Sequence, residues 1–483
     1  MRRVTRRRAL AGIGALAGAA LFNGCAINPV TGKPELMIMT EAQEIKLGGE
    51  AHGQILAQYG AYGDESIQEW FNERGQEMAM KTHRKQLPWK FTVLDSPVIN
   101  AFAVPGGYVY VTRGILGYMS SEAQFGGVLG HELGHVNARH TAATYSKAQL
   151  TDLGLQIGSM ISPKFAFFAQ VASLGTQLLF LKFSRDDERQ ADQLGVEYSS
   201  QMGYDAVEMS EFFKTLERLS PPGGSLPAWQ STHPDPGDRI NDTRRMAMAF
   251  QKSHTDMTFS VLREEYIDRI NGLVYGDDPR QGFMEEGVFY HPEINFQFPV
   301  PADWEMLNLP TEVRFAPEKE DAVLVFTLAT EDSPKAASDA FTLSNKVQVM
   351  SAEEITVNSM PAYKTVGQIV NEGNVVGINS YFIKMDEKIY VFHGVSASQN
   401  INEYDKAFEK SATGFGKIVD ESKLHAEPER IEVRRIASST TLRSAFNDFG
   451  VEEDHLDKMS LINGLMLDDI VPGGAGLKLV AKP

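Results

Sequence analysis

The chain has 483 residues, more than the ~250–300 that one hydrophobic core can hold, so we expect two or three domains. Its 42% hydrophobic and 10% aromatic residues are typical of a folded globular protein. The formal net charge of −17 argues against a nucleic-acid partner, because phosphate backbones repel an acidic surface.

Residues 1–25 have the pattern of an export signal. Five arginines precede an apolar run at residues 9–22, which is shorter than the ~20 residues that a membrane-spanning helix needs. The "TRRRAL" segment also resembles a twin-arginine export signal. Removal of residues 1–25 takes away five of the 46 basic residues and none of the 63 acidic ones, which leaves 41 and a net charge of −22. We therefore expect an exported, strongly acidic protein.

Cys25 is the one cysteine of the chain, so no intrachain disulfide can form. It stands where the signal of a bacterial lipoprotein places the residue that becomes acylated, and we predict its lipidation; the alternative is a free thiol beside an ordinary cleavage site. Ala26, and not an aspartate, follows Cys25, which favours the outer membrane. The expected location is the periplasm, with a lipid anchor in the outer membrane.

Residues 26–255 are expected to form a mainly helical domain, because stretches such as "DAVEMSEFFKTLERL" place apolar residues at helical spacing. The stretch "NAFAVPGGYVYVTRGIL" is an exception and predicts a strand that includes Tyr108, Val109 and Tyr110 after a turn at Gly107. The apolar residues 165–183 contain polar side chains, so they predict a buried helix or a membrane-leaning hairpin and not a membrane span. Helices around a small sheet are the expected outcome.

Two further units are expected after a helical linker at residues 256–286. Alternating apolar and polar residues predict an α+β domain at residues 287–420. Its opening, "YHPEINFQFPVPADWE", resembles the α/β sandwich domains of photosystem-associated extrinsic proteins. Residues 426–483 resemble a divergent LysM module, a small βααβ unit that often binds peptidoglycan. The expected fold class is α+β, and neither extra unit shows a cluster of acids, nucleophiles or metal ligands.

The stretch "GGVLGHELGHVNARH" carries a metal-binding pattern. On a helix, His131 and His135 lie on one face about one turn apart, so two imidazole nitrogens can meet one ion. Glu132 points about 100° away and is placed to touch a water on that ion. The alternative is a helix with incidental polar residues.

A catalytic zinc needs a third protein ligand. The class that uses a third histidine is excluded, because Ala138 and Thr141 stand where it needs glycine and histidine. A second class takes a glutamate from another helix, and "FSRDDERQADQLG" offers Glu188 with Asp192 one turn later. Asp192 could accept the second N–H of a ligand histidine and fix its tautomer. The alternative is a solvated run of charges.

Three segments together, "NAFAVPGGYVYVTRG", "HELGHVNARH" and "SRDDERQAD", resemble zinc metallopeptidases of the family that includes the CAAX prenyl protease, the heat-shock membrane protease and the periplasmic assembly-maintenance protease of Gram-negative bacteria. The resemblance covers about residues 40–250. It implies one Zn²⁺ per chain, bound by His131, His135 and Glu188. It also implies Glu132 as general base and Asp192 as the partner of a ligand histidine.

Downstream, "STHPDPGDRI" matches the family's His-Pro and nearby arginine, which implies catalytic roles for His233 and Arg239. His233 could stabilise the oxyanion of the tetrahedral intermediate. It could also become a fourth ligand that displaces the water and silences the enzyme. The alternative is a histidine in a proline-rich surface turn.

These residues predict a zinc endopeptidase in which zinc lowers the pKa of a bound water toward ~7 and Glu132 takes its proton. The backbone of Gly107, Tyr108, Val109 and Tyr110 is expected to pair with an extended substrate, which favours unfolded peptides. The resemblance implies quality control of unfolded or misfolded envelope proteins. The alternatives are a latent, chaperone-like or scaffold lipoprotein that binds clients, and a protein tethered to peptidoglycan through residues 426–483.

Overall fold

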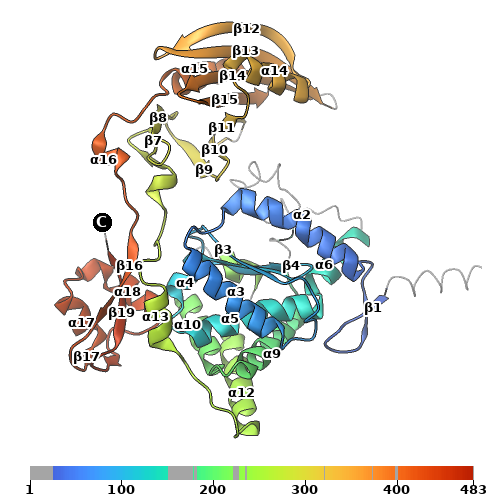
Figure 1. The fold of residues 1–483 in the computed structure, drawn as a ribbon, viewed down its shortest axis with the longest axis vertical. Helices are drawn as coiled ribbons and strands as arrows, with labels where there is room; N and C mark the ends of the chain where they lie inside the picture. Colours follow the sequence, from blue (N-terminus) through green and yellow to red (C-terminus); the bar gives the residue numbers. More distant parts are fainter. Residues whose placement is uncertain are drawn as a thin grey trace, which may run out of the picture.

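The structure is a computed structural model that describes residues 25–150, 178, 182–220, 228–233, 236–319, 321–371, 374–397 and 401–481. The predicted signal, apart from Cys25, and most of the apolar residues 165–183 lie outside this range. None of the described helices is both long and apolar enough to span a bilayer. The prediction of a mixed α+β protein is confirmed. Figure 1 shows a largely helical body, a strand-rich domain above it and a small unit beside it.

The helical body surrounds a small sheet that has an unexpected strand order. Its strands are β3 (Lys90–Leu94), β4 (Ala101–Val104) and β5 (Tyr108–Thr112), in the order β3-β5-β4. β5 pairs in parallel with β3 and antiparallel with β4. Alternate residues of β5 face opposite sides: Tyr110 packs with α2 (Glu41–Tyr59), whereas Val109 packs with α3 (Glu65–Ala79). The sheet is therefore covered on both faces.

Helices α5 (Glu122–Ala138) and α9 (Arg185–Gln201) form the centre of the body. Each begins at a serine that caps its first turn, Ser121 and Ser184. The two helices approach closely because glycines line the contact: a Cβ added at Gly130 would lie 2.8 Å from the carbonyl oxygen of Gly195. Gly134 is similarly close to Ala191. The glycines of "LGHELGH" therefore bring the two helices that carry the predicted ligands together.

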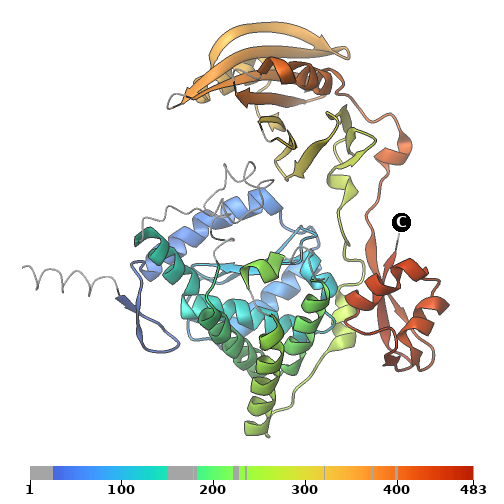
Figure 2. The same cartoon turned by 180° about the vertical axis from the view of Figure 1, so that it is seen from behind.

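Further helices complete the body and the segment that follows it. They are α4 (Arg113–Tyr118), α6 (His140–Leu150), α10 (Val207–Arg218), α11 (Ala228–Thr232), α12 (Pro236–Ser253) and α13 (Arg263–Arg269). Figure 2 shows α12 running down beside α9 and α10. α11 is one turn long, and its Trp229 donates a backbone hydrogen bond of 3.3 Å to the carbonyl of Ile99, just before β4. This contact places α11 at the outer side of the small sheet.

The upper domain is built on a seven-stranded antiparallel sheet in the order β12-β13-β14-β15-β11-β10-β9. Its strands are β9 (Trp304–Asn308), β10 (Glu312–Pro317), β11 (Ala322–Ala329), β12 (Gln348–Val357), β13 (Met360–Asn371), β14 (Asn374–Met385) and β15 (Lys388–Ala397). Val391 packs under α14 (Pro334–Ser344), and Phe392 packs under α15 (Ile401–Thr413) on the other face. A smaller sheet also packs against the second face: β6 (Phe283–Glu285), β7 (Val288–His291) and β8 (Phe296–Pro299).

The C-terminal unit contains β16 (Arg430–Arg435), α17 (Leu442–Asp448), α18 (Leu456–Ile462) and β19 (Gly476–Ala481), with β16 and β19 antiparallel. It packs on the body through a buried lysine. Lys478 Nζ donates to the carbonyls of Gly117 at 2.9 Å and Met119 at 2.6 Å, at the end of α4. Ile431 of β16 belongs to the hydrophobic core of the body. The unit is therefore joined firmly to the body.

Candidate metal centre

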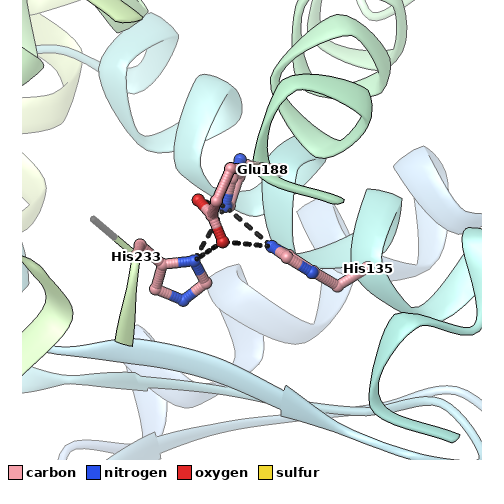
Figure 3. Close-up of side chains that lie close together, drawn as sticks. His135, Glu188 and His233 are labelled. Carbon is pink, nitrogen blue, oxygen red and sulfur yellow. Dashed lines mark hydrogen bonds and ion pairs between the residues drawn. The ribbon is translucent and has the colours of Figure 1, made fainter. Parts of the chain in front are cut away.

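The two histidines of α5 converge as their spacing predicts. Their Nε2 atoms lie 3.0 Å apart, and both rings are fully buried. Glu188, in the first turn of α9, faces them: its Oε1 is 3.5 Å from His135 Nε2. Figure 3 shows the side chains of His135, Glu188 and His233 meeting at one point. The described structure thus brings together residues that are 57 positions apart in the sequence, from His131 to Glu188.

His233 joins this group directly. Its Nδ1 lies 2.9 Å from Glu188 Oε1 and 3.2 Å from His131 Nε2. The ring is buried, so the alternative of a histidine in an exposed turn is wrong. The ring stacks on Trp229 with 4.8 Å between centroids and 21° between planes, which fixes its orientation.

The four donors fit a tetrahedral divalent cation. Zn–N and Zn–O bonds of ~2.0–2.1 Å at tetrahedral angles put neighbouring donors about 3.3 Å apart. The donor-to-donor distances given above range from 2.9 to 3.5 Å, and all four donor atoms lie within 4.8 Å of one another. Glu188 Oε2 lies 3.2 Å from the Arg239 guanidinium, so the other oxygen, Oε1, is the one that faces the histidine nitrogens.

Asp192 and Arg239 contact His131 and Glu188 on the side that faces away from the donor cluster. Asp192 Oδ1 lies 2.9 Å from His131 Nδ1, the nitrogen that points away from the donor cluster. Arg239 binds both oxygens of Asp192, at 2.7 and 2.6 Å, and its Nη1 lies 3.2 Å from Glu188 Oε2. The guanidinium is buried and stacks over Phe213. Arg239, which the sequence predicted as catalytic, thus contacts the carboxylates of Asp192 and Glu188.

The charge states in this buried site suit a cation. Burial lowers the pKa of His135 well below its usual value, and its histidine neighbours lower it further. Burial opposes ionisation of Glu188, but His233 and Arg239 outweigh it and keep its pKa below the usual value. Burial likewise opposes ionisation of Asp192, whereas Arg239 and His131 lower its pKa to about 2. The carboxylates are thus ionised and His135 is neutral at pH 7.

Glu132 lies beside the donors without joining them. It is buried, its Oε1 accepts a hydrogen bond of 3.3 Å from Trp229 Nε1, and it is 3.8 Å from His233 Nε2. Sequence reasoning missed Trp229, because the tryptophan stands alone in a segment with no periodic pattern. Phe183, whose ring centroid is 4.0 Å from that of His135, was also missed.

The predicted substrate-binding strand needs a correction. β5 lies between β3 and β4, so the backbone of Tyr108, Val109 and Tyr110 is already paired on both sides. Gly107 also pairs, through its carbonyl, with the N–H of Lys90. The prediction that these residues pair with a peptide is wrong for this reason. The edge strands of this sheet are β3 and β4, and Ala61 bridges the outer edge of β3 at Leu94, which leaves β4 as the more open edge.

Comparisons with known proteins agree with this geometry. Residues 65–247 match Peptidase family M48. The chain is 27% identical over 213 residues to the beta-barrel assembly-enhancing protease of Escherichia coli (strain K12), covering 42% of this chain and 44% of that protein. It is 31% identical over 171 residues to the mitochondrial metalloendopeptidase OMA1 of Arabidopsis thaliana, covering 35% and 34%. The chain thus spans less than half the length of these two relatives.

Solved structures are similar to part of the chain at low identity. The solution structure of cyanobacterial PsbP from Synechocystis sp. PCC 6803 matches 27% of this chain and 91% of that chain, at 13% identity and a TM-score of 0.24. A likeness of this size supports no argument about function.

Proposed function

Because residues 65–247 form a Peptidase family M48 domain, as the sequence motifs predicted, we propose that this protein is a zinc-dependent endopeptidase. His131, His135 and Glu188 bind one Zn²⁺, and Glu132 is the general base. The observation that supports this most strongly is the group of four buried donor atoms within 4.8 Å of one another, next to an acid that is not among them.

A bound zinc supplies Lewis acidity, which makes water a better nucleophile at neutral pH and polarises the scissile carbonyl. Glu132 takes the proton of the attacking water and then passes it to the leaving amine. Trp229 Nε1 holds Glu132 Oε1 at 3.3 Å and so keeps the carboxylate aimed at the donor cluster. Arg239 and Asp192 keep His131 in the tautomer that leaves Nε2 free.

Substrates bind along β4. Thr112 N–H donates to the carbonyl of Asn100, so alternate residues of β4 from Asn100 onward point their backbone toward β5. Ala101 and Ala103 therefore point their N–H and C=O groups to the open edge. The open edge ends at Ile99, because the carbonyl of Ile99 accepts a hydrogen bond from the backbone N–H of Trp229. The ring of Trp229 stacks on His233. An extended peptide added to β4 would therefore run past the donor cluster.

The clients are unfolded or misfolded envelope proteins, since pairing through the main chain selects extended segments and not particular side chains. A related protein is named for β-barrel assembly, which supports a role in the cell envelope. Lipidation of Cys25 anchors the protein to the outer membrane on the periplasmic side. The C-terminal unit at residues 426–483 could bind peptidoglycan.

A second function is favoured by His233. With its Nδ1 at 2.9 Å from Glu188 Oε1 and 3.2 Å from His131 Nε2, this imidazole lies where a fourth zinc ligand would lie. A site closed in this way leaves no position for water and is latent. In that state the protein would bind clients as a chaperone-like or scaffold lipoprotein with little proteolysis.

The proposed function is tested by Glu132→Gln. The variant is expected to keep one zinc per chain and to cleave unfolded casein about 10²–10⁴-fold more slowly than the wild type. Glu73→Gln, which changes an exposed glutamate on α3, is the matched control and should behave as wild type. Metal analysis and casein cleavage are the measurements; wild-type cleavage by Glu132→Gln would refute the general-base role.

A further inference from the structure

A fourth histidine, His140, lies behind the donor cluster and has no role in the steps above. It is the first residue of α6 and is buried, with 2% of its surface exposed. Its Nδ1 lies 3.0 Å from His135 Nδ1, the nitrogen that points away from the donors. Its Nε2 lies 2.9 Å from Oε1 of Gln190 on α9. His140 thus bridges the ligand His135 to the helix that carries Glu188.

The chain of contacts fixes where the protons lie. An amide oxygen can only accept, so His140 Nε2 must carry the proton that it shares with Gln190. A neutral imidazole has one N–H, which leaves His140 Nδ1 as an acceptor. His135 Nδ1 must then donate to it. His135 Nε2 is left with a free lone pair directed at the donor cluster, as a metal ligand requires.

We propose that His140 is a positioning residue that sets the tautomer and ring orientation of His135 for metal binding, and that Gln190 sets the tautomer of His140. The inference rests on the proposed zinc site. It gives each ligand histidine of α5 its own support from α9: Asp192 for His131 directly, and Gln190 for His135 through His140.

The backbone is built to place His140 there. In an uninterrupted α-helix, residues five apart point about 140° away from each other, so His140 could not reach behind His135. The helix is instead ended by Arg139, which has φ +62° and ψ +30°, an uncommon conformation for a residue with a side chain. The Arg139 guanidinium is held by the carboxylate of Glu44 and by the carbonyl of Met39 at 2.6 Å. These contacts stabilise the turn that brings His140 back toward His135.

The two supports differ in charge. His131 is backed by the carboxylate of Asp192, which Arg239 neutralises. His135 is instead backed by the imidazole of His140, which is hydrogen-bonded to the amide of Gln190 and lies 3.7 Å from the carboxylate of Asp187. Loss of His140 should therefore leave the charge of the site unchanged and alter only the direction and tautomer of His135. A variant that restores an acceptor at this position should restore metal binding.

The experiment measures zinc affinity by competition with a chromophoric chelator, and the thermal midpoint of the metal-free protein. His140→Leu is expected to weaken zinc binding about 10–100-fold, the usual cost of losing such a partner. His140→Asn, whose side-chain oxygen can replace Nδ1 as acceptor, should recover most of the affinity. Gln190→Leu should weaken binding less than His140→Leu. His83→Leu is the control, because His83 also contacts α9, through Tyr198 Oη at 2.6 Å, but lies away from the donors.

The proposal is supported if zinc affinity is lowest in His140→Leu and is largely restored in His140→Asn, while the thermal midpoints of these two metal-free variants are the same. It is overturned if His140→Leu binds zinc as the wild type does, or if His140→Asn binds as weakly as His140→Leu. These outcomes are distinct from a failure of the proposed function, in which the wild type itself would bind no zinc.

Discussion

His233 Nδ1 lies 2.9 Å from Oε1 of Glu188, so the imidazole is one of the group of donor atoms. Burial disfavours the charged form of His233, but Glu188 and Glu132 raise its pKa above the usual value. The imidazole of His233 is thus attracted to the carboxylate of Glu188. His233 is therefore the residue that would decide whether the fourth ligand position of the proposed zinc site is open to water or closed by an imidazole.

Replacing His233 tests that balance. If the imidazole closes the site, His233→Ala should raise casein cleavage at least about 10-fold, because a water can then occupy the fourth position. The double variant Glu132→Gln/His233→Ala is the control and should stay inactive. A fall in cleavage by His233→Ala, with zinc content unchanged, would instead show that the imidazole acts during the reaction.

The contact between α5 and α9 should not tolerate a side chain at Gly130. A Cβ there would lie 2.8 Å from the carbonyl oxygen of Gly195, so the helices must move apart, at a cost of about 1–3 kcal/mol. Because the helices carry the ligands, zinc affinity should fall together with stability in Gly130→Ala. Gly53→Ala on α2 is the control: no atom lies within 4 Å of its added Cβ, and the change should stabilise slightly. Urea unfolding and chelator competition measure both effects.

The open edge of β4 can be blocked without disturbing the metal. Ala103→Pro removes one N–H that faces the open edge, a place where proline is tolerated in a sheet. We expect casein cleavage to fall, mainly through a higher KM, while zinc content stays that of the wild type. Ala103→Val keeps the N–H and is the control. Equal KM values for the two variants would show that peptides do not pair with β4.

The upper domain should lose stability in mild acid because of His393. The ring stacks on Phe341 with centroids 4.0 Å apart, and burial lowers its pKa to about 4. Between its ordinary 6.5 and about 4 the unfolded chain binds a proton that the folded chain does not, so the free energy of unfolding falls as pH falls through this window. Allowing for partial exposure, the loss is about 2 kcal/mol.

His393→Phe keeps the aromatic stack and removes the titration. Urea unfolding of the full chain at pH 7.5 and 4.5 should therefore show a smaller loss of stability in this variant than in the wild type. His425→Gln, a change at an exposed histidine, serves as the control. An equally steep loss in His393→Phe would contradict the assignment.

The parts of the site that the sequence predicted are those set by helical periodicity. His131 with His135, and Glu188 with Asp192, are each one turn apart, so their shared faces follow from the spacing alone. The order of the sheet does not follow in this way: β3 and β5 are parallel neighbours although β4 lies between them in the sequence, which local alternation cannot reveal. His140 was missed because its position depends on the left-handed turn at Arg139, where a glycine would have given a clue.

The upper domain enters and leaves the rest of the chain at a single joint. Val274 and Arg430 form a β-bridge, and the hydrogen bonds from Tyr275 N–H to Glu429 at 2.8 Å and from Ile431 N–H to Leu273 at 2.9 Å extend it on both sides. The C-terminal unit contributes Ile431 to the core of the helical body, although 155 residues separate Val274 from Arg430. The segment between them is an insertion that starts and ends at one point, so a short turn could replace it while the body and the C-terminal unit stay joined.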